Sequence, residues 1–316
     1  MATVTKRFRI LSIDGGGIRG VIPLVLLQRL VAQLGDFLAG AQLIAGTSTG
    51  GLIALGLARG LTLEDLLELY TKKGKLIFDD SWLDDLVDLG GLAGAEYDNK
   101  ALTKELKASF GAETTLGDLG KRVAVTAFDL DNEDANPRER RWKPKVFHNF
   151  PGTDSDAAEL AYKVGLYTSA APTYFPVVDG YIDGGVFANN PSVCALTQAL
   201  DERGYPAPAQ PPALADVRLL SLGTGITPSR IEGKNLDWGK ARWMSVILQV
   251  LMDGTAGIAD FQCRQILGDR GYQRLDVRFR PGDAIGLDDV DAVTKLVEYA
   301  KGVDLTSAAD WIRRQW

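Results

Sequence analysis

A serine between glycines is the residue of this sequence best suited to nucleophilic catalysis. Ser48 stands at the centre of a Gly-x-Ser-x-Gly pentapeptide that runs from Gly46 to Gly50. Between a strand and a helix, such a turn exposes the hydroxyl at the amino end of the helix, whose partial positive charge stabilises a developing anion. A glycine turn with a capping serine has the same pattern, but the apolar runs on both sides favour the nucleophile.

A serine hydroxyl is a poor nucleophile at neutral pH and needs a general base. The chain contains one histidine, His148, at the end of a predicted strand over Lys145–His148. In α/β-hydrolases the histidine comes last in the order Ser, Asp, His, whereas His148 precedes Asp183. We therefore interpret His148 as an ordinary sheet or surface residue and consider the aspartates in glycine turns.

Two Asp-Gly-Gly turns follow predicted strands, one at Asp14 and the other at Asp183. Each also suits a plain β-turn, because Asp and Gly are favoured there. The first turn leads into a helix, so the amides of Gly15, Gly16 and Gly17 can form a concave anion site with no side chains in the way. We expect this loop to be an oxyanion hole, which leaves Asp183 as the base.

The same loop matches the dinucleotide fingerprint Gly-x-Gly-x-x-Gly at Gly15, Gly17 and Gly20. Two observations disfavour that interpretation. Asp14 would bring a negative charge near a pyrophosphate, and the next predicted strand leads into Ser48 where an acidic ribose ligand is expected.

The chain around these motifs follows the pattern of an α/β domain. A predicted strand at Phe8–Ile13 leads through the glycine loop into an apolar helix at Val21–Leu34. A short strand at Gln42–Ala45 then leads through a turn into a helix at Leu52–Leu57. This alternation is typical of a largely parallel sheet covered by helices.

The remaining pattern is compatible with a single domain over residues 1–316. The further elements that we predict are several helices between Thr62 and Phe110, strands at Lys121–Phe128 and Val217–Leu222, helices at Ala157–Ala170 and Pro191–Leu200, and a helical apolar stripe between Trp238 and Leu267. Val217–Leu222 is the last internal strand that the sequence pattern predicts.

Composition excludes several classes of function. The net charge of −6 and the pI near 5.0 argue against a dedicated nucleic-acid binder. One histidine and two cysteines cannot build a histidine cluster or a four-cysteine zinc site.

The basic start of the chain is followed by too short an apolar run for a signal peptide, so we expect a cytoplasmic protein. The charge-free stretch Phe37–Ala58 could span a bilayer by length, but its central glycines favour strand, turn and helix.

Three sequence blocks together resemble the patatin-like phospholipases, whose fold is similar to the catalytic domain of cytosolic phospholipase A2. The first block is Asp14–Gly20, the second is Gly46–Gly51, and the third is Asp183–Gly185 followed by Asn189-Asn190-Pro191. They occur in the order of the family and lie within a core of about residues 8–200. The resemblance implies a three-layer α/β/α fold with a central, largely parallel sheet.

The resemblance also implies a lipid acyl hydrolase with a Ser-Asp dyad and neither cofactor nor metal. Ser48 would be the nucleophile, Asp183 the base, and the loop Gly15–Gly17 the oxyanion hole, with Arg19 bracing that loop or meeting a phosphate. The substrate would be a phospholipid or another acyl-ester lipid, reached by transient contact with a membrane surface. The resemblance leaves open whether a small ligand or a protein activates this chain, since the family also includes effector phospholipases that a ligand switches on.

Two further groups of residues are candidates for contact with lipid. Candidates for an acyl channel, which also suit a plain core, are Phe175, Val177, Val178, Val186 and Phe187. Candidates for a membrane surface, which also suit a solvated loop and a packed helix, are Arg138, Arg140, Arg141, Trp142, Lys143 and Lys145 in one segment and Phe78, Trp82 and Leu83 in another.

Two other classes of function share some of these features. An acyltransferase of the malonyl type would use the same serine, but such enzymes pair it with a histidine, and here only His148 is present. A non-enzymatic binding module would keep the glycine loop as an anion site for a phosphorylated ligand.

Overall fold

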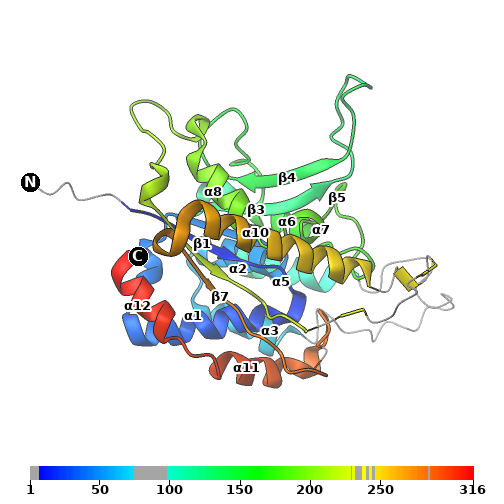
Figure 1. Cartoon of the computed structure of the whole chain (residues 1–316). Helices are drawn as coiled ribbons and strands as arrows, with labels where there is room; N and C mark the ends of the chain where they lie inside the picture. The colour runs from blue at the N-terminus through cyan, green and yellow to red at the C-terminus, as the bar shows by residue number, and fades with distance from the viewer. Residues whose placement is uncertain are drawn as a thin grey trace, which may run out of the picture.

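A computed structural model describes residues 7–74, 98–228, 246–283 and 285–316, together with 230–231, 237–239 and 242–243. Its centre is a seven-stranded sheet in the order β4-β3-β2-β1-β6-β7, with β5 paired to β3 (Figure 1). The strands are β1 (Phe8–Ile13), β2 (Leu43–Thr47), β3 (Arg122–Asp129), β4 (Lys143–His148), β5 (Tyr181–Asp183), β6 (Val217–Leu222) and β7 (Tyr272–Leu275). The pairs β3-β2, β2-β1, β1-β6 and β6-β7 are parallel, whereas β4 and β5 run antiparallel to β3.

Helices cover both faces of the sheet, so the predicted three-layer α/β/α architecture is confirmed. One face packs against α1 (Val21–Leu34), α2 (Thr49–Arg59), α3 (Leu63–Thr71), α5 (Lys100–Phe110), α6 (Ala161–Ser169), α11 (Val293–Lys301) and α12 (Thr306–Gln315). The other face packs against α8 (Ser192–Leu200) and α10 (Ile247–Gly271), and the short α7 (Gly185–Ala188) lies against α10.

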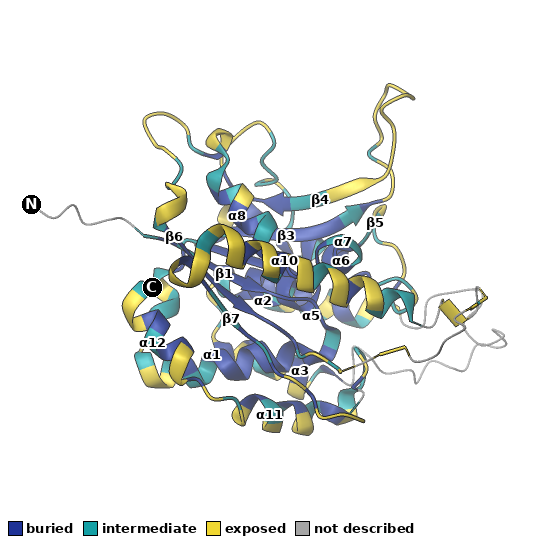
Figure 2. Ribbon diagram, in the orientation of Figure 1, coloured by how far each residue is buried: buried dark blue, intermediate teal, exposed yellow. Residues whose placement is uncertain are grey.

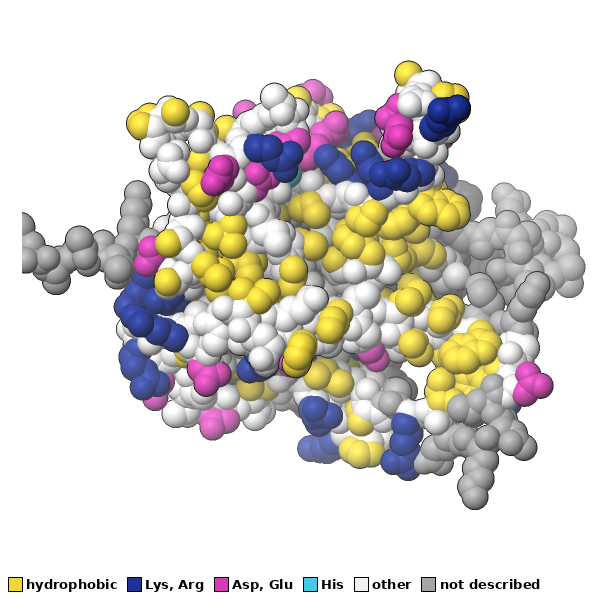
Figure 3. All heavy atoms as spheres, turned by 45° about the horizontal axis from the view of Figure 1, so that its top comes forward, with side chains coloured by type: hydrophobic (Ala, Val, Ile, Leu, Met, Phe, Trp, Pro, Cys, Tyr) yellow, Lys and Arg dark blue, Asp and Glu magenta, His cyan; other side chains and the backbone are white. Residues whose placement is uncertain are grey.

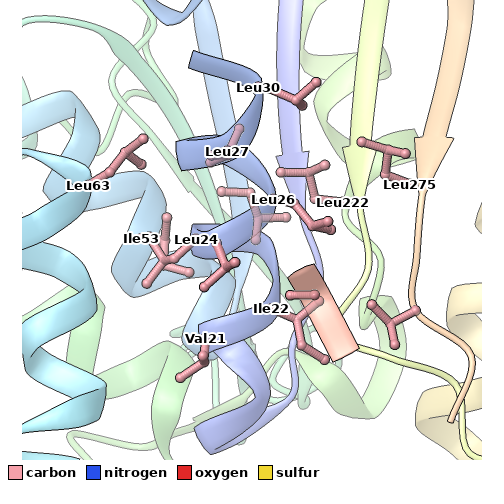
Figure 4. Packing of buried hydrophobic residues seen from close by; sticks show 14 of the residues in the cluster. Val21, Ile22, Leu24, Leu26, Leu27, Leu30, Ile53, Leu63, Leu222 and Leu275 are labelled. Atoms are coloured by element: carbon pink, nitrogen blue, oxygen red, sulfur yellow. The ribbon is translucent and has the colours of Figure 1, made fainter. Parts of the chain in front are cut away.

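Helix α1 is apolar around most of its circumference because it lies between the sheet and other helices. Figure 4 shows its leucines packed against Ile53 of α2, Leu63 of α3 and Leu222 and Leu275 of the sheet. Among the described residues, the stretch Gly17–Leu34 is long and apolar enough to cross a membrane, but 61% of it is buried inside the protein. Burial of this kind is typical of a core helix.

The predicted elements near the first two motifs are confirmed. The bounds of β1, α1 and β6 agree with the predicted ranges, and Phe37–Ala58 contains β2, a turn and α2 rather than a continuous helix. Helix α6 begins four residues later than predicted, at Ala161.

Strand β7, which the sequence pattern did not predict, extends the sheet beyond β6. Only two of its four residues, Tyr272 and Leu275, are buried, so its sequence has a weak apolar signal. The candidate membrane residues Phe78, Trp82 and Leu83 lie outside the described residues.

Candidate active site

One edge of β3 holds both β2 and β5, and this arrangement brings two sequence-distant motifs together. Strand β2 pairs with β3 up to Thr47 opposite Thr126, and β5 takes over at the next residue, with Asp183 opposite Ala127. Ser48 follows Thr47 directly, so the pairing places Ser48 and Asp183 at adjacent positions along the same edge.

Ser48 lies in a sharp turn between β2 and α2, with φ of 53° and ψ of −126°. A side chain at either flanking glycine would collide with backbone, because a Cβ on Gly46 would lie 2.0 Å from the Gly50 carbonyl oxygen and one on Gly50 would lie 2.1 Å from that of Ile13. The amide of Ser48 donates to Thr168 Oγ1 at 2.7 Å. The turn is therefore fixed by close packing and by a buried hydrogen bond.

Asp183 is buried, with 5% of its surface exposed, and its carboxyl lies within hydrogen-bonding reach of the Ser48 hydroxyl. The amide of Gly185 donates to Asp183 Oδ1 at 2.7 Å. Burial raises the pKa of Asp183 to about 6, although the hydrogen bonds from Ser48 and Gly185 lower it. The carboxylate is therefore ionised at neutral pH and more basic than an exposed aspartate.

The glycine loop lies directly against the serine, since a Cβ on Gly15 would lie 3.3 Å from Ser48 Cβ. Its three amides are not equivalent. The amide of Gly15 donates to the Asn189 carbonyl oxygen at 2.9 Å, whereas no hydrogen bond between described residues uses the amides of Gly16 or Gly17. Within the described residues the Gly15 amide is thus occupied, which favours Gly16 and Gly17 as the amides open to an anion.

Close contacts explain why the loop is made of glycines. Gly17 has a φ of +55°, and a Cβ there would lie 2.1 Å from the Leu287 carbonyl oxygen. A Cβ on Gly16 would lie 2.4 Å from Thr224 Oγ1, whose hydroxyl donates to the Gly15 carbonyl oxygen at 2.6 Å.

Arg19 is buried beside this loop, and its Nε lies 3.5 Å from the Gly16 carbonyl oxygen. Burial lowers the pKa of the guanidinium, and the charges of Asp253 and Asp276 partly offset that effect. Arg19 is not among the residues that line the pocket described below. Its position suits a brace for the loop better than a contact with substrate phosphate.

The start of the loop is held by an ion-pair network that sequence patterns did not reveal. Arg274 of β7 bonds both Asp14, at 2.7 Å, and Asp276, at 2.6 Å, and its other terminal nitrogen donates to Ser221 Oγ. All three charged side chains are largely buried. Burial raises the pKa of Asp14 to about 6 despite the neighbouring guanidinium, so this carboxylate is ionised at neutral pH. The network links the glycine loop to the edge of the sheet.

A mostly apolar pocket opens over the serine and the aspartate. Its lining includes Ser48, Asp183, Gly17, Leu52, Leu69, Leu102, Leu106, Phe175, Val186, Leu248 and Met252. Of the five candidates for an acyl channel, Phe175 and Val186 line the pocket. The other three do not, because Val178 packs in the core near α6, Phe187 packs on Phe128, and Val177 is 52% exposed.

His148 lies away from this pocket. It ends β4 opposite Ala124, its amide donates to Asp156, and its ring packs edge-on against Phe150. Burial lowers the pKa of the imidazole, which favours the neutral ring. The interpretation of His148 as a sheet residue agrees with this position.

Comparison with known proteins gives a consistent result. A family model described as "Patatin-like phospholipase" matches residues 11–193. The sporulation protein CotR of Bacillus subtilis is 27% identical over 98% of this chain and 98% of its own length. A cGAMP-activated phospholipase of Pseudomonas aeruginosa is 30% identical over 91% of this chain and 83% of its own. Patatin-like protein 1 of Oryza sativa is 30% identical over 92% of this chain and 78% of its own length.

Removing the centre of the ion-pair network should destabilise the protein strongly. In Arg274→Met, Asp14 and Asp276 lose their shared cation in a buried site, and we expect a loss of about 3–5 kcal/mol in the free energy of unfolding. Urea unfolding at pH 7 measures it. Adding Asp14→Asn to this variant should restore part of the lost stability, because it removes one of the two unpaired buried charges. A loss below about 1 kcal/mol in Arg274→Met would contradict a stabilising role of the ion-pair network.

Proposed function

This chain belongs to the patatin-like phospholipase family, and on that basis we propose that it is a lipid acyl hydrolase of the phospholipase A type that works through a Ser48-Asp183 dyad. The observation that carries the proposal is the shared edge of β3, which places the buried Asp183 carboxyl beside the Ser48 hydroxyl under an apolar pocket. The family supports an enzyme that acts on lipid esters, and the site supplies the residues for the chemistry.

In the first step, Ser48 Oγ attacks the carbonyl carbon of a fatty-acyl ester while its proton moves to the Asp183 carboxylate. The carbonyl oxygen becomes an oxyanion, and the amides of Gly16 and Gly17 donate to it. Collapse of the tetrahedral intermediate breaks the ester bond, and the departing alkoxide takes the proton from Asp183. The products are an acyl-Ser48 enzyme and a free alcohol such as a lysophospholipid.

In the second step, water attacks the acyl-Ser48 carbonyl carbon and gives its proton to Asp183. The new oxyanion is held by the same two amides, and its collapse expels Ser48 Oγ, which recovers the proton. A fatty acid leaves, and the dyad returns to its starting state. Gly15 acts as a positioning residue in this scheme, because its amide is engaged by the Asn189 carbonyl.

The substrate side of the proposal follows from the pocket. Leucine, phenylalanine, valine and methionine side chains line it, which suits an acyl chain rather than a sugar or a peptide. We propose a phospholipid or another acyl-ester lipid as substrate, hydrolysed by a cytoplasmic enzyme during transient contact with a membrane. A serine-histidine acyltransferase is disfavoured, because His148 does not line the pocket.

Substitution of the two dyad residues tests the proposal directly. Ser48→Ala and Asp183→Asn should each lower kcat on a soluble short-chain ester by about 10²–10⁴-fold, because they remove the nucleophile or its base. His148→Ala is the matched control and should keep activity within about twofold. Near-wild-type activity in either variant would contradict the Ser48-Asp183 mechanism.

The dyad should also cost stability, with a definite dependence on pH. The folded-state pKa of Asp183 lies above the ordinary value of 3.8, so the stability of the wild type falls as pH rises from that value through about 6. Asp183→Asn keeps an acceptor for the Gly185 amide but removes the ionisation.

We therefore expect Asp183→Asn to be more stable than the wild type at pH 8, by up to about 3 kcal/mol, and to lose this advantage at about pH 4. Denaturant unfolding at the two values measures the difference. An advantage that is equal at both values, or absent at pH 8, would contradict a desolvated carboxylate at this position.

A further inference from the structure

The outer face of α10 carries large apolar side chains that are exposed. Val250, Leu251, Ile258 and Phe261 are 46%, 43%, 52% and 57% exposed. They share one face of the helix, because positions seven, eight and eleven residues apart recur on the same side. We name these four residues the α10 stripe. Figure 2 shows the outward side of α10 exposed along much of its length.

The orientation of α10 is fixed, so the stripe is not a misplaced core face. Met252, Ala259 and Cys263 on the inward side are buried. Of the charged residues near the stripe, Asp260 is bonded by Tyr272 and Arg264, and Asp253 accepts from Gln249. Between Val250 and Phe261, the exposed positions are the four stripe residues, two glycines and Asp253, so apolar side chains predominate in this part of the helix.

The stripe adjoins the pocket that contains Ser48. Leu248 and Met252, from the first turns of the same helix, line that pocket. Thr255 of α10 accepts a hydrogen bond from the amide of Asn189, whose carbonyl oxygen holds the Gly15 amide. Helix α10 thus connects an exposed apolar surface, the pocket wall and, through Asn189, the glycine loop.

We propose that the α10 stripe is the surface on which this protein docks to a lipid bilayer, with the pocket facing the acyl esters. This inference rests on the proposed lipid acyl hydrolase function, because a substrate held in a bilayer requires contact between its surface and the pocket. The stripe inserts among the headgroups and upper acyl chains, as exposed apolar faces of helices do at interfaces.

The size of the stripe favours a bilayer over a second copy of this chain. Four half-exposed side chains present a few hundred Å² of apolar surface, less than the roughly 800 Å² per partner that a stable protein interface buries. A bilayer needs no matching shape, so a small apolar face is sufficient for reversible docking.

Charge contributes little to this docking. The hairpin over residues 130–145, which contains the basic membrane candidates, has five basic and four acidic residues, and Arg140 is paired with Asp131. Figure 3 shows basic and acidic side chains mixed along the upper edge of the face in view, above its hydrophobic side chains. With a net charge of −6 as well, the protein should bind uncharged lipid surfaces and depend little on salt.

Vesicle binding in a Ser48→Ala background tests the proposal without hydrolysis of the lipid. The double change Ile258→Asp and Phe261→Asp should lower the fraction that sediments with phosphatidylcholine vesicles at least tenfold. Thr294→Asp, which adds a charge to an exposed position of α11 in the other helical layer, is the control and should bind as the parent does. Raising salt from about 0.1 to 0.5 M should leave parent binding unchanged.

The same double change in the active enzyme separates docking from chemistry. We expect hydrolysis of phosphatidylcholine vesicles to fall at least tenfold while hydrolysis of a soluble short-chain ester stays within twofold of the wild type. If the enzyme hydrolyses no ester but the stripe variant still loses vesicle binding, the proposed function fails and the docking surface stands.

Three outcomes would overturn the docking surface. They are vesicle binding that the double change leaves intact, binding that requires anionic lipid and disappears with salt, and a dimer in size-exclusion chromatography that the double change converts to a monomer. The last would assign the stripe to a second copy of the chain.

Discussion

The architecture of the site depends on how backbone hydrogen bonds are shared along one edge of β3. Strand β2 occupies that edge as far as Thr126, and β5 occupies it from Ala127 onward. Because β2 must leave the edge at Ser48, the chain turns sharply there, and because β5 enters at Asp183, the carboxylate arrives beside the turn. The distance between Ser48 and Asp183 is thus set by strand pairing rather than by surface loops.

A buried carboxylate is costly, and the surrounding structure compensates for that cost with fixed hydrogen bonds. The Gly185 amide and the Ser48 hydroxyl donate hydrogen bonds to the Asp183 carboxylate, and Thr168 Oγ1 accepts a hydrogen bond from the Ser48 amide. The glycine loop has its own support in the Asp14-Arg274 ion pair. Burial thus gives Asp183 a basicity that an exposed aspartate lacks, and the ion pair fixes the start of the glycine loop beside it.

Local sequence patterns were sufficient to predict the elements that carry the motifs. Strand β1 and helix α1 are predominantly apolar runs, and glycines on both sides of Ser48 mark the turn. Other features arise only from tertiary contacts and left no local signal. The Gly15 amide donates to the carbonyl oxygen of Asn189, and the ion pair that holds Asp14 comes from Arg274; both partners are far away in the sequence. The apolar stripe between Trp238 and Leu267 was visible in the sequence, but periodicity shows that a face is apolar without showing what covers it.

The Ser48-Asp183 dyad is tested by the rate at which a fluorophosphonate labels Ser48 as a function of pH. Labelling requires only the activated hydroxyl, so neither lipid docking nor deacylation affects the result. We predict that the labelling rate of the wild type rises with pH around a midpoint of about 6, the pKa of Asp183, and that the rate in Asp183→Asn is at least 100-fold lower at pH 8. Labelling of Asp183→Asn at the wild-type rate would contradict the account.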